Sequence, residues 1–299
     1  MGEGEQARAT DRPAGRVGFG GALAQRSRDG RLSPRFDEAT AVTAAGDGLW
    51  LADCSDDWSV PRGPNGGYLA AIIVRAIEAQ VADPARSMRS LTLHYLRPPA
   101  NGPLEVAVTV ERQGRTLTSV TARASQEGKP YVLAIAALAG GFGSELEFSQ
   151  PMPEVEPASA IEPWPLVEEM PPVAQRVEMR PAVGGAPFSG ADEAYTGGWI
   201  GLREPHRYDA ALLAFLSDVW MPPTLMSVLD PVGVPTIDLT IHFRNPKAAL
   251  EASPDQPVLG IFESEFAVDS FVEEDARIWS PAGVLLAQSR QLAALLPAA

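Results

Sequence analysis

The sequence contains a single cysteine, Cys54, and no long hydrophobic run. One cysteine excludes an internal disulfide and fits a reducing compartment. No apolar stretch approaches the ~20 residues that a membrane-spanning helix needs. Residues 1–33 also lack the apolar core of a secretory signal. We therefore expect a cytoplasmic protein without a membrane span, whose residues 1–33 form a disordered leader.

Motifs of several enzyme classes are also missing. The three histidines are scattered and no spaced cysteines accompany them, so no metal site is expected. The chain has no G-x-S-x-G elbow and no Walker loop. Gly18-Phe19-Gly20-Gly21 has no strand before it and is not read as a dinucleotide fingerprint. We therefore expect no cofactor.

The charge is strongly acidic, with 24 Lys and Arg against 38 Asp and Glu and a formal net charge of −14. This balance argues against a nucleic-acid partner, because such a surface repels a polyanion over the long range. The 299 residues, 45% of them hydrophobic, are those of an ordinary globular protein. They are enough for two domains of ordinary size.

A short segment is repeated along the chain. Leu91-Thr92-Leu93-His94-Tyr95 is followed closely by Pro98, and Leu239-Thr240-Ile241-His242-Phe243 is followed closely by Pro246. His242 lies 148 residues after His94, which is about half of the chain. This spacing is typical of two copies of one domain.

A helix is predicted before each copy. Asn65 offers an N-cap before Gly66-Gly67, and apolar residues then recur at helical spacing around nearly the whole circumference. A helix that is apolar all round is enclosed by other elements rather than laid on a surface. The second helix is predicted over residues 212–220, with Pro222 and Pro223 bringing it to an end.

Strand-like segments accompany each helix. In the first half they cover residues 47–53, 91–96, 104–113, 117–126 and 130–138. In the second half they cover residues 175–180, 195–203, 236–244, 258–267, 271–279 and 284–295. Consecutive strands around one buried helix indicate antiparallel sheets of the α+β class. We predict an N-terminal domain over residues 34–140, a Pro/Glu-rich linker over residues 141–172 and a C-terminal domain over residues 173–299.

Local motifs occur in a recognisable order along residues 34–296. They are Asn65-Gly66-Gly67, His94-Tyr95-Leu96-Arg97-Pro98, Ser217-Asp218 within the second helix, Thr236-Ile237-Asp238, and Gly283 to Ala287 leading to Gln291. This set resembles the acyl-CoA thioesterase II family. The resemblance implies a double hot-dog fold, in which two antiparallel sheets each wrap around a long central helix and join as a pseudo-dimer with one continuous sheet surface.

The resemblance also implies an activity, the hydrolysis of acyl-CoA thioesters to free acid and CoA. In the family an Asp on the second helix, a Thr on the following strand and a Gln on the last strand position the hydrolytic water. The matching positions here are Asp218, Thr236 and Gln291.

The chemistry of these residues supports such a role. Helical spacing places Asp218 on one face with Ala211, Ala214 and Phe215, so its carboxylate projects into apolar surroundings. Desolvation there raises a carboxyl pKa toward a value that suits a general base, although a buried structural hydrogen bond is the alternative role. Asp238, a strand-end acid, is a second candidate for the base.

The side chains of Thr236 and Gln291 can each donate and accept a hydrogen bond, so they suit a bound water. Strand alternation, however, groups Thr236 with Asp238 and His242 on the less apolar face. Thr236 then serves only if that face lines the seam between the domains. His94 and His242, at matching positions of the two repeats, are expected to have a structural role at sheet-edge backbone.

An oxyanion or substrate site is expected at the start of the first helix. The backbone N–H groups of Gly66, Gly67 and Tyr68 lack partners within the helix, and glycine allows a ligand to approach closely. A tight strand-to-helix turn explains the same glycines.

The expected partners are an acyl-CoA substrate and a second copy of the chain, giving a dimer of double hot-dogs. Five arginines that cluster in sequence are candidates for binding CoA phosphates, with solvated strand-edge charges as the alternative: Arg89, Arg97, Arg112, Arg115 and Arg123. Two other functions stay open, a different hot-dog enzyme such as a hydratase and a non-catalytic acyl-CoA binding protein. Bulky apolar residues are candidates for the acyl tunnel, or else core: Trp199, Trp220, Met221 and Met226.

Overall fold

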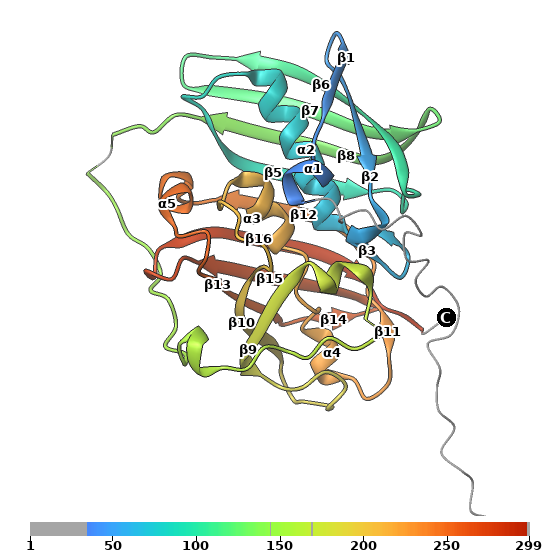
Figure 1. The fold of residues 1–299 in the computed structure, drawn as a ribbon, viewed down its shortest axis with the longest axis vertical. Coiled ribbons are helices and arrows are strands. Elements are labelled where there is room, and N and C mark those ends of the chain that lie inside the picture. The colour runs from blue at the N-terminus through green and yellow to red at the C-terminus, as the bar shows by residue number, and fades with distance from the viewer. Residues whose placement is uncertain (1–34, 144, 169, 298–299) are drawn as a thin grey trace, which may run out of the picture.

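The computed structural model describes residues 35–143, 145–168 and 170–297 (Figure 1). The predicted leader over residues 1–33 lies outside this part of the chain. No helix of the described part is both long and apolar enough to cross a membrane. The secondary structure is dominated by antiparallel strands.

The strands come from both halves of the chain. The first half contributes β1 (Thr43–Gly46), β2 (Leu49–Cys54), β5 (Ser87–Tyr95), β6 (Gly102–Gln113), β7 (Leu117–Gln126) and β8 (Lys129–Ala139). The second half contributes β9 (Val177–Gly184), β10 (Ala194–Leu202), β12 (Thr236–Phe243), β13 (Val258–Ser264), β14 (Ala267–Val268), β15 (Phe271–Trp279) and β16 (Leu285–Ala294). Two short ribbons pair β3 (Ser59–Val60) with β4 (Gly63–Pro64), and β11 (Val232–Gly233) with β17 (Leu296–Pro297).

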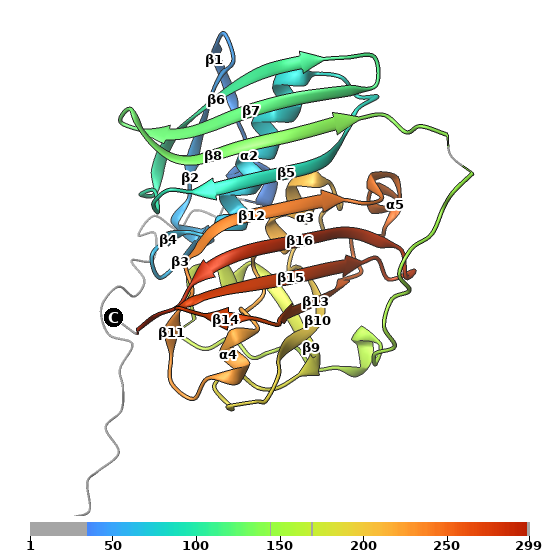
Figure 2. The same cartoon turned by 180° about the vertical axis from the view of Figure 1, so that it is seen from behind.

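All of the longer strands belong to one sheet of 13 strands, in the order β1-β2-β6-β7-β8-β5-β12-β16-β15-β13-β10-β9 with β14 beside β15 (Figures 1 and 2). The two predicted sheets therefore meet edge to edge. The joining strands are β5 and β12, which carry the two copies of the repeated segment. Thr92 lies directly opposite Thr240, and His94 lies opposite Asp238.

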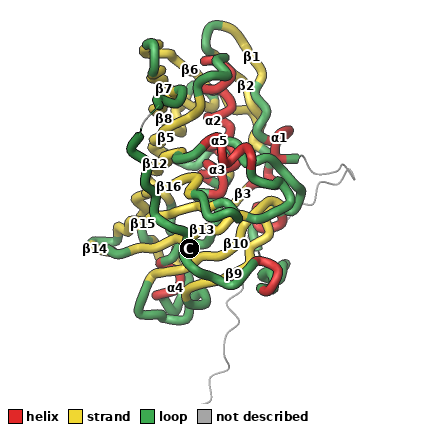
Figure 3. Tube along the Cα trace, turned by 90° about the vertical axis from the view of Figure 1, so that its left-hand side faces the viewer, coloured by secondary structure: helices red, strands yellow, loops and turns green. Residues whose placement is uncertain are grey.

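Two helices pack on one face of this sheet at its centre (Figure 3). α2 (Gly66–Val81) has 16 residues, begins at the N-cap Asn65 and is buried on nearly all sides, as its apolar pattern predicts. α3 (Ala210–Leu216) has only 7 residues. The start of α2 lies against the end of α3, while Arg75 in the middle of α2 binds Asp209 at the start of α3. The two helices are thus antiparallel.

The second helix is shorter than predicted and does not contain Asp218. It ends at Leu216, where the Asp218 N–H bonds the Phe215 carbonyl (3.2 Å) in a tighter turn and the Ser217 hydroxyl bonds the Leu213 carbonyl (2.8 Å). Residues 217–220 then form a turn that precedes Pro222. Further short helices are α1 (Phe36–Ala39), α4 (Thr224–Ser227) and α5 (Pro246–Glu251).

The Pro/Glu-rich segment lies along the second half of the molecule rather than standing free. Trp199 donates from Nε1 to the Glu156 carbonyl (2.8 Å), and Trp164 packs its ring 5.2 Å from that of Trp220. Trp199, Trp279 and Leu285 belong to a small apolar cluster that this segment covers. This cluster is separate from the main core around α2 and α3. Trp220 and Met226, by contrast, are buried within the second half. The domain boundaries at residues 140 and 172 stay a prediction.

Candidate functional site

The Asp218 carboxylate is bound by the first turn of α2. Its Oδ2 accepts hydrogen bonds from Gly67 N–H (2.7 Å) and from Asn65 Nδ2 (3.0 Å), and Asn65 also reaches the Asp218 carbonyl (3.4 Å). An anion at a helix start is stabilised by unpaired N–H groups and by the helix dipole. The carboxylate is therefore fixed in position by the other half of the chain.

Glycine is required where the two helices meet. A Cβ at Gly67 would lie 2.6 Å from the Phe215 carbonyl oxygen, and one at Gly66 would lie 2.9 Å from Asp218 Oδ2. Neither contact leaves room for a methyl group. The tight turn expected at these glycines is thus also what lets Asp218 approach the α2 backbone.

The surroundings of Asp218 change its acidity. Burial raises the pKa of this carboxyl to about 6, against the lowering effect of the hydrogen bonds from Gly67 and Asn65 and of the nearby Thr236 hydroxyl. Since the charged form is disfavoured by desolvation, the group takes up a proton far more readily than a surface aspartate. It is nevertheless largely ionised at neutral pH, which is the state that a general base requires.

Thr236 and Gln291 meet on the same face of the sheet as Asp218. Thr236 Oγ1 donates to Gln291 Oε1 (2.8 Å), and Gln291 is only 6% exposed. The prediction that Thr236 shares a face with Asp238 is wrong, because the β12–β16 pairing contains an irregularity between these two residues. Such a bulge adds one residue and so reverses the side on which Thr236 projects.

Glu274, which sequence reasoning missed, belongs to the same cluster. It lies opposite Gln291 in the β15–β16 pairing and is 6% exposed. Burial raises its pKa well above the usual value, the nearby Asp218 charge adds to this effect, and a hydrogen bond with Gln291 opposes it. The available signal was its alternation with Val272, Ala276 and Ile278, which places an acid among the buried positions of the strand.

Two of the three amides predicted to bind an oxyanion already have acceptors within the protein. Gly67 N–H donates to Asp218, and Tyr68 N–H donates to the N-cap Asn65 Oδ1 (2.9 Å). No hydrogen bond from Gly66 N–H is found within the described residues. The Gly66 carbonyl accepts from the Tyr95 hydroxyl (2.8 Å), so Tyr95 also lies beside this site.

The other polar candidates lie away from Asp218. Asp238 pairs with Leu292, whose side chain projects to the opposite face from that of its neighbour Gln291. Asp238 therefore projects to the outer side of the sheet. His94 and His242 are exposed on that outer side. β5 and β12 are interior strands, so the role at a sheet edge expected for the two histidines does not apply.

The five arginines do not form one patch. Arg89, Arg112 and Arg115 lie near the end of the N-terminal sheet where residues 87, 139 and 117 align. Arg97 and Arg123 lie near the opposite end, where residues 95, 132 and 124 align. Eight residues of strand, about 25 Å, separate the two ends. Of the two groups, only Arg97 and Arg123 lie at the same end of the sheet as Asp218, because Tyr95 contacts Gly66 at that end.

The other end of the helix pair holds a cavity of about 510 Å³ between α2, α3 and the start of β5. Its walls include Met88, which stands 148 residues before Thr236, and the β5–β8 pairing is irregular between Met88 and Ser90 as the β12–β16 pairing is at Thr236. Ala136 and Val120 occupy the strand positions that correspond to Gln291 and Glu274. At this end apolar side chains therefore occupy the strand positions that Thr236, Gln291 and Glu274 occupy beside Asp218.

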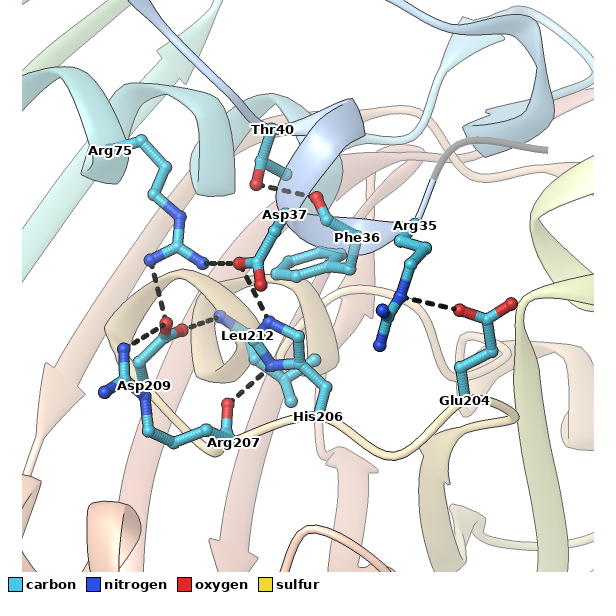
Figure 4. Close-up of polar contacts among 10 residues, drawn as sticks. All are labelled: Arg35, Phe36, Asp37, Thr40, Arg75, Glu204, His206, Arg207, Asp209 and Leu212. Carbon is cyan, nitrogen blue, oxygen red and sulfur yellow. Dashed lines mark hydrogen bonds and ion pairs between the residues drawn. The ribbon is translucent and has the colours of Figure 1, made fainter. Parts of the chain in front are cut away.

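Charged side chains tie the helices together at this second end (Figure 4). Arg75 of α2 donates to Asp37 of α1 (2.9 Å) and to Asp209 at the start of α3 (2.8 Å), and His206 contacts Asp37 (3.0 Å). Asp209 also caps α3 by accepting from Leu212 N–H (2.9 Å). Here the carboxylate caps its own helix, whereas Asp218 binds the start of the neighbouring helix.

Solved structures with this architecture are known. A conserved hot dog fold protein from Alicyclobacillus acidocaldarius is 23% identical with a TM-score of 0.81, the match covering 90% of this chain and 100% of that one. A provisionally assigned thioesterase II from Thermobifida fusca is 23% identical with a TM-score of 0.76, covering 92% and 99%. The acyl-CoA thioesterase II TesB2 from Mycobacterium marinum is 18% identical with a TM-score of 0.69, covering 88% and 98%. These likenesses show the hot-dog fold.

Sequence families match both halves of the chain. The acyl-CoA thioesterase N-terminal domain matches residues 54–139, and the acyl-CoA thioesterase C-terminal domain matches residues 150–295. A search of curated proteins finds no match. The two domain matches, in the expected order and on this fold, show that the chain belongs to the acyl-CoA thioesterase family of hot-dog proteins.

Proposed function

We propose that the protein hydrolyses acyl-CoA thioesters to a free acid and CoA, using a water oriented by Asp218, Thr236 and Gln291. One observation carries the proposal. Three residues from separate elements, the turn after α3 and strands β12 and β16, gather in a single cluster that includes an ionisable acid, with Gln291 buried and Asp218 and Thr236 partly buried. A purely structural core has no need of such a group, because burying a carboxylate is costly.

In this mechanism Asp218 is the general base. It removes a proton from the water while the water oxygen attacks the thioester carbonyl carbon, so that a C–O bond forms and the carbonyl oxygen becomes an oxyanion. Collapse of the intermediate breaks the C–S bond. The proton held by Asp218 passes to the departing CoA thiolate, which returns the carboxylate to its starting state.

The oxyanion is assigned to the start of α2. Gly66 N–H points out of the first turn of this helix, where the helix dipole favours negative charge. The N–H groups of Gly67 and Tyr68 lie in the same turn, but they already donate to Asp218 and Asn65. A substrate oxygen would compete with these two acceptors for their hydrogen bonds.

The finer arrangement follows from the same geometry. We infer that the two halves are related as the subunits of a dimer, since equivalent strands β5 and β12 pair at the centre and α2 and α3 pack antiparallel beneath them. The acyl chain is then placed in the apolar region between the helices. The dimer of double hot-dogs stays a prediction.

The hydratase alternative needs an acid and histidine pair at the site, and no histidine of the described residues lies beside Asp218. Within the described residues His94 and His242 face the outer side of the sheet, and His206 contacts Asp37 at the far end of the helix pair. A non-catalytic binder is the remaining alternative.

The test is an assay of thiol release from acyl-CoAs of increasing chain length. The wild-type chain is expected to release CoA from at least one of them, and Asp218→Asn to lower kcat/KM by about 10²- to 10⁴-fold with folding intact. Asp238→Asn, on the other face of the same sheet, is the matched control and is expected to keep its activity. Binding of an acyl-CoA without any thiol release would instead establish the non-catalytic binder.

A further inference from the structure

Glu274 occupies a position that structural stability does not explain. Its strand neighbours on the inner face, Val272 and Ala276, are buried apolar residues. Its partner across the strand pair is Gln291, the last member of the proposed hydrolytic set. If Glu274 were ionised, it would be a desolvated negative charge next to the Asp218 carboxylate. The arrangement therefore disfavours the ionisation of both carboxyls at once.

No positive charge compensates for this pair within the described residues. Arg277 binds Glu263, and Arg290 binds Asp275 on the outer face of β15. The remaining charged groups near Glu274 are themselves acids, namely Asp218 from the turn after α3 and Glu273 and Asp275 on its own strand. Burial and three acidic neighbours both raise the pKa of Glu274 well above its usual value, so of the two carboxyls it is Glu274 whose neutral form is favoured.

The Gln291 amide links the two carboxyls and can do so in two orientations. In the structure its Oε1 accepts from Thr236 Oγ1, which turns the NH₂ group toward Glu274. The reversed amide would present Oε1 to Glu274 and NH₂ to Thr236. The Thr236 hydroxyl has only one proton, so it donates either to Gln291 or to Asp218.

We propose that Glu274 is a positioning residue, a neutral carboxylic acid that donates its proton to Gln291 Oε1 and thereby turns the Gln291 NH₂ group toward Thr236 and the hydrolytic water. The Thr236 proton is then released to Asp218, so a single hydrogen-bonded chain runs from Glu274 through Gln291 and Thr236 to the base. Ionised Glu274 reverses this chain and adds a second negative charge beside the developing oxyanion. The inference rests on the proposed hydrolysis for its effect on rate.

The kinetic test compares two substitutions. Glu274→Ala removes the donor and is expected to lower kcat about tenfold to a hundredfold with little change in KM, because the water is misoriented while the substrate still binds. Glu274→Gln keeps a neutral donor of nearly the same shape. Its kcat is expected to be at least tenfold higher than that of Glu274→Ala. Equal losses in both variants would overturn the proposal.

The pH profile separates positioning from packing. For the wild-type chain kcat/KM is expected to fall at alkaline pH as Glu274 ionises, and Glu274→Gln is expected to lose this fall. Asp275→Asn, which changes the neighbouring outward-facing acid, is the matched control and keeps the wild-type profile. An alkaline fall that persists in Glu274→Gln would contradict the assignment.

An infrared measurement tests the protonation without any activity. A buried neutral carboxyl has a C=O stretching band that the carboxylate lacks, and the difference between wild type and Glu274→Gln at pH 7 should contain it. Absence of this band refutes the neutral Glu274 whether or not the protein hydrolyses thioesters. Presence of the band in a chain that releases no thiol would instead contradict the proposed function alone.

Discussion

Thr92 and Thr240 hydrogen-bond to each other through their hydroxyls (3.0 Å) across the strand pair that joins the two halves, and they are 148 residues apart in the chain. Around them the pairing is reciprocal, with His94 opposite Asp238 and Ser90 opposite His242. Each repeated segment thus pairs with the other copy of itself. The sequence repeat and the centre of the sheet are the same feature.

The hydroxyl pair should be measurable as a coupling energy. Thr240→Val keeps the β-branched shape and is expected to lower the free energy of unfolding by about 1 kcal/mol, because Thr92 loses its partner. The double variant with Thr92→Val is expected to cost less than the sum of the single changes. Denaturant unfolding of the four proteins measures this difference, and strict additivity would show that the two hydroxyls are independent.

Gly67→Ala should disrupt the meeting point of the two helices. The added methyl group would lie 2.6 Å from the Phe215 carbonyl and 3.0 Å from the Asp218 Cβ. We expect a loss of about 2 kcal/mol in stability and a fall in thiol release, because Asp218 is displaced from the Gly67 N–H. Gly141→Ala, where no atom lies within 4 Å, is the control and should change neither quantity. A stable and active Gly67→Ala variant would mean that the two helices separate at little cost.

The Asp218 carboxyl should make stability depend on pH in a definite direction. Its pKa is about 6 in the folded protein and 3.8 in the reference state, so the folded chain binds more protons in this window. The free energy of unfolding should therefore fall as pH rises from about 4 to about 6, by about 3 kcal/mol at most. Glu78, whose pKa burial raises to about 7, acts in the same direction.

Denaturant unfolding at pH 4.5, 5.5 and 7 measures this slope. Asp218→Asn should flatten it, and Glu78→Gln should flatten a separate part that extends nearer to pH 7. If the Asp218→Asn variant keeps the wild-type slope, the Asp218 carboxyl is not desolvated.

Arg75→Met should destabilise the protein without reaching the hydrolytic cluster. Arg75 binds both Asp37 and Asp209, and Asp209 is mostly buried. Its loss leaves an unpaired acid at the start of α3, which we expect to cost about 2 kcal/mol. Arg207→Met, at an exposed arginine 4.0 Å from the same Asp209, is the control and should cost less than about 0.5 kcal/mol. A similar cost for both variants would show that Asp209 does not require Arg75.

The periodic elements of the fold were predictable from the sequence. The segments 117–126 and 271–279 match β7 and β15 at both ends, and α2 follows from the N-cap Asn65 and the apolar run after it. These elements are determined by local pattern, since alternation and helical spacing report which side of an element is buried. The two copies of the repeated segment lie on β5 and β12, the strands that pair at the centre of the sheet.

The site was less predictable because its geometry depends on departures from regular structure. A bulge in β12 reverses the side on which Thr236 projects, and an early end to α3 moves Asp218 from a helix into a turn. Glu274 was missed because an acid inside a strand is normally read as a solvent-facing position. Its burial arises from a neighbouring strand and from the turn after α3, both distant in sequence.

The continuous sheet has a consequence for how the polypeptide is connected. The main-chain ladder between β5 and β12 aligns the halves edge to edge, and the covalent connection over residues 140–176 adds local concentration to this pairing. Two fragments made separately and divided within that tether would each expose one unpaired central edge, the type of edge that recruits a complementary strand. Such fragments are natural candidates for reassembly by complementation, with the recovery of thiol release reporting that the severed protein has been rebuilt.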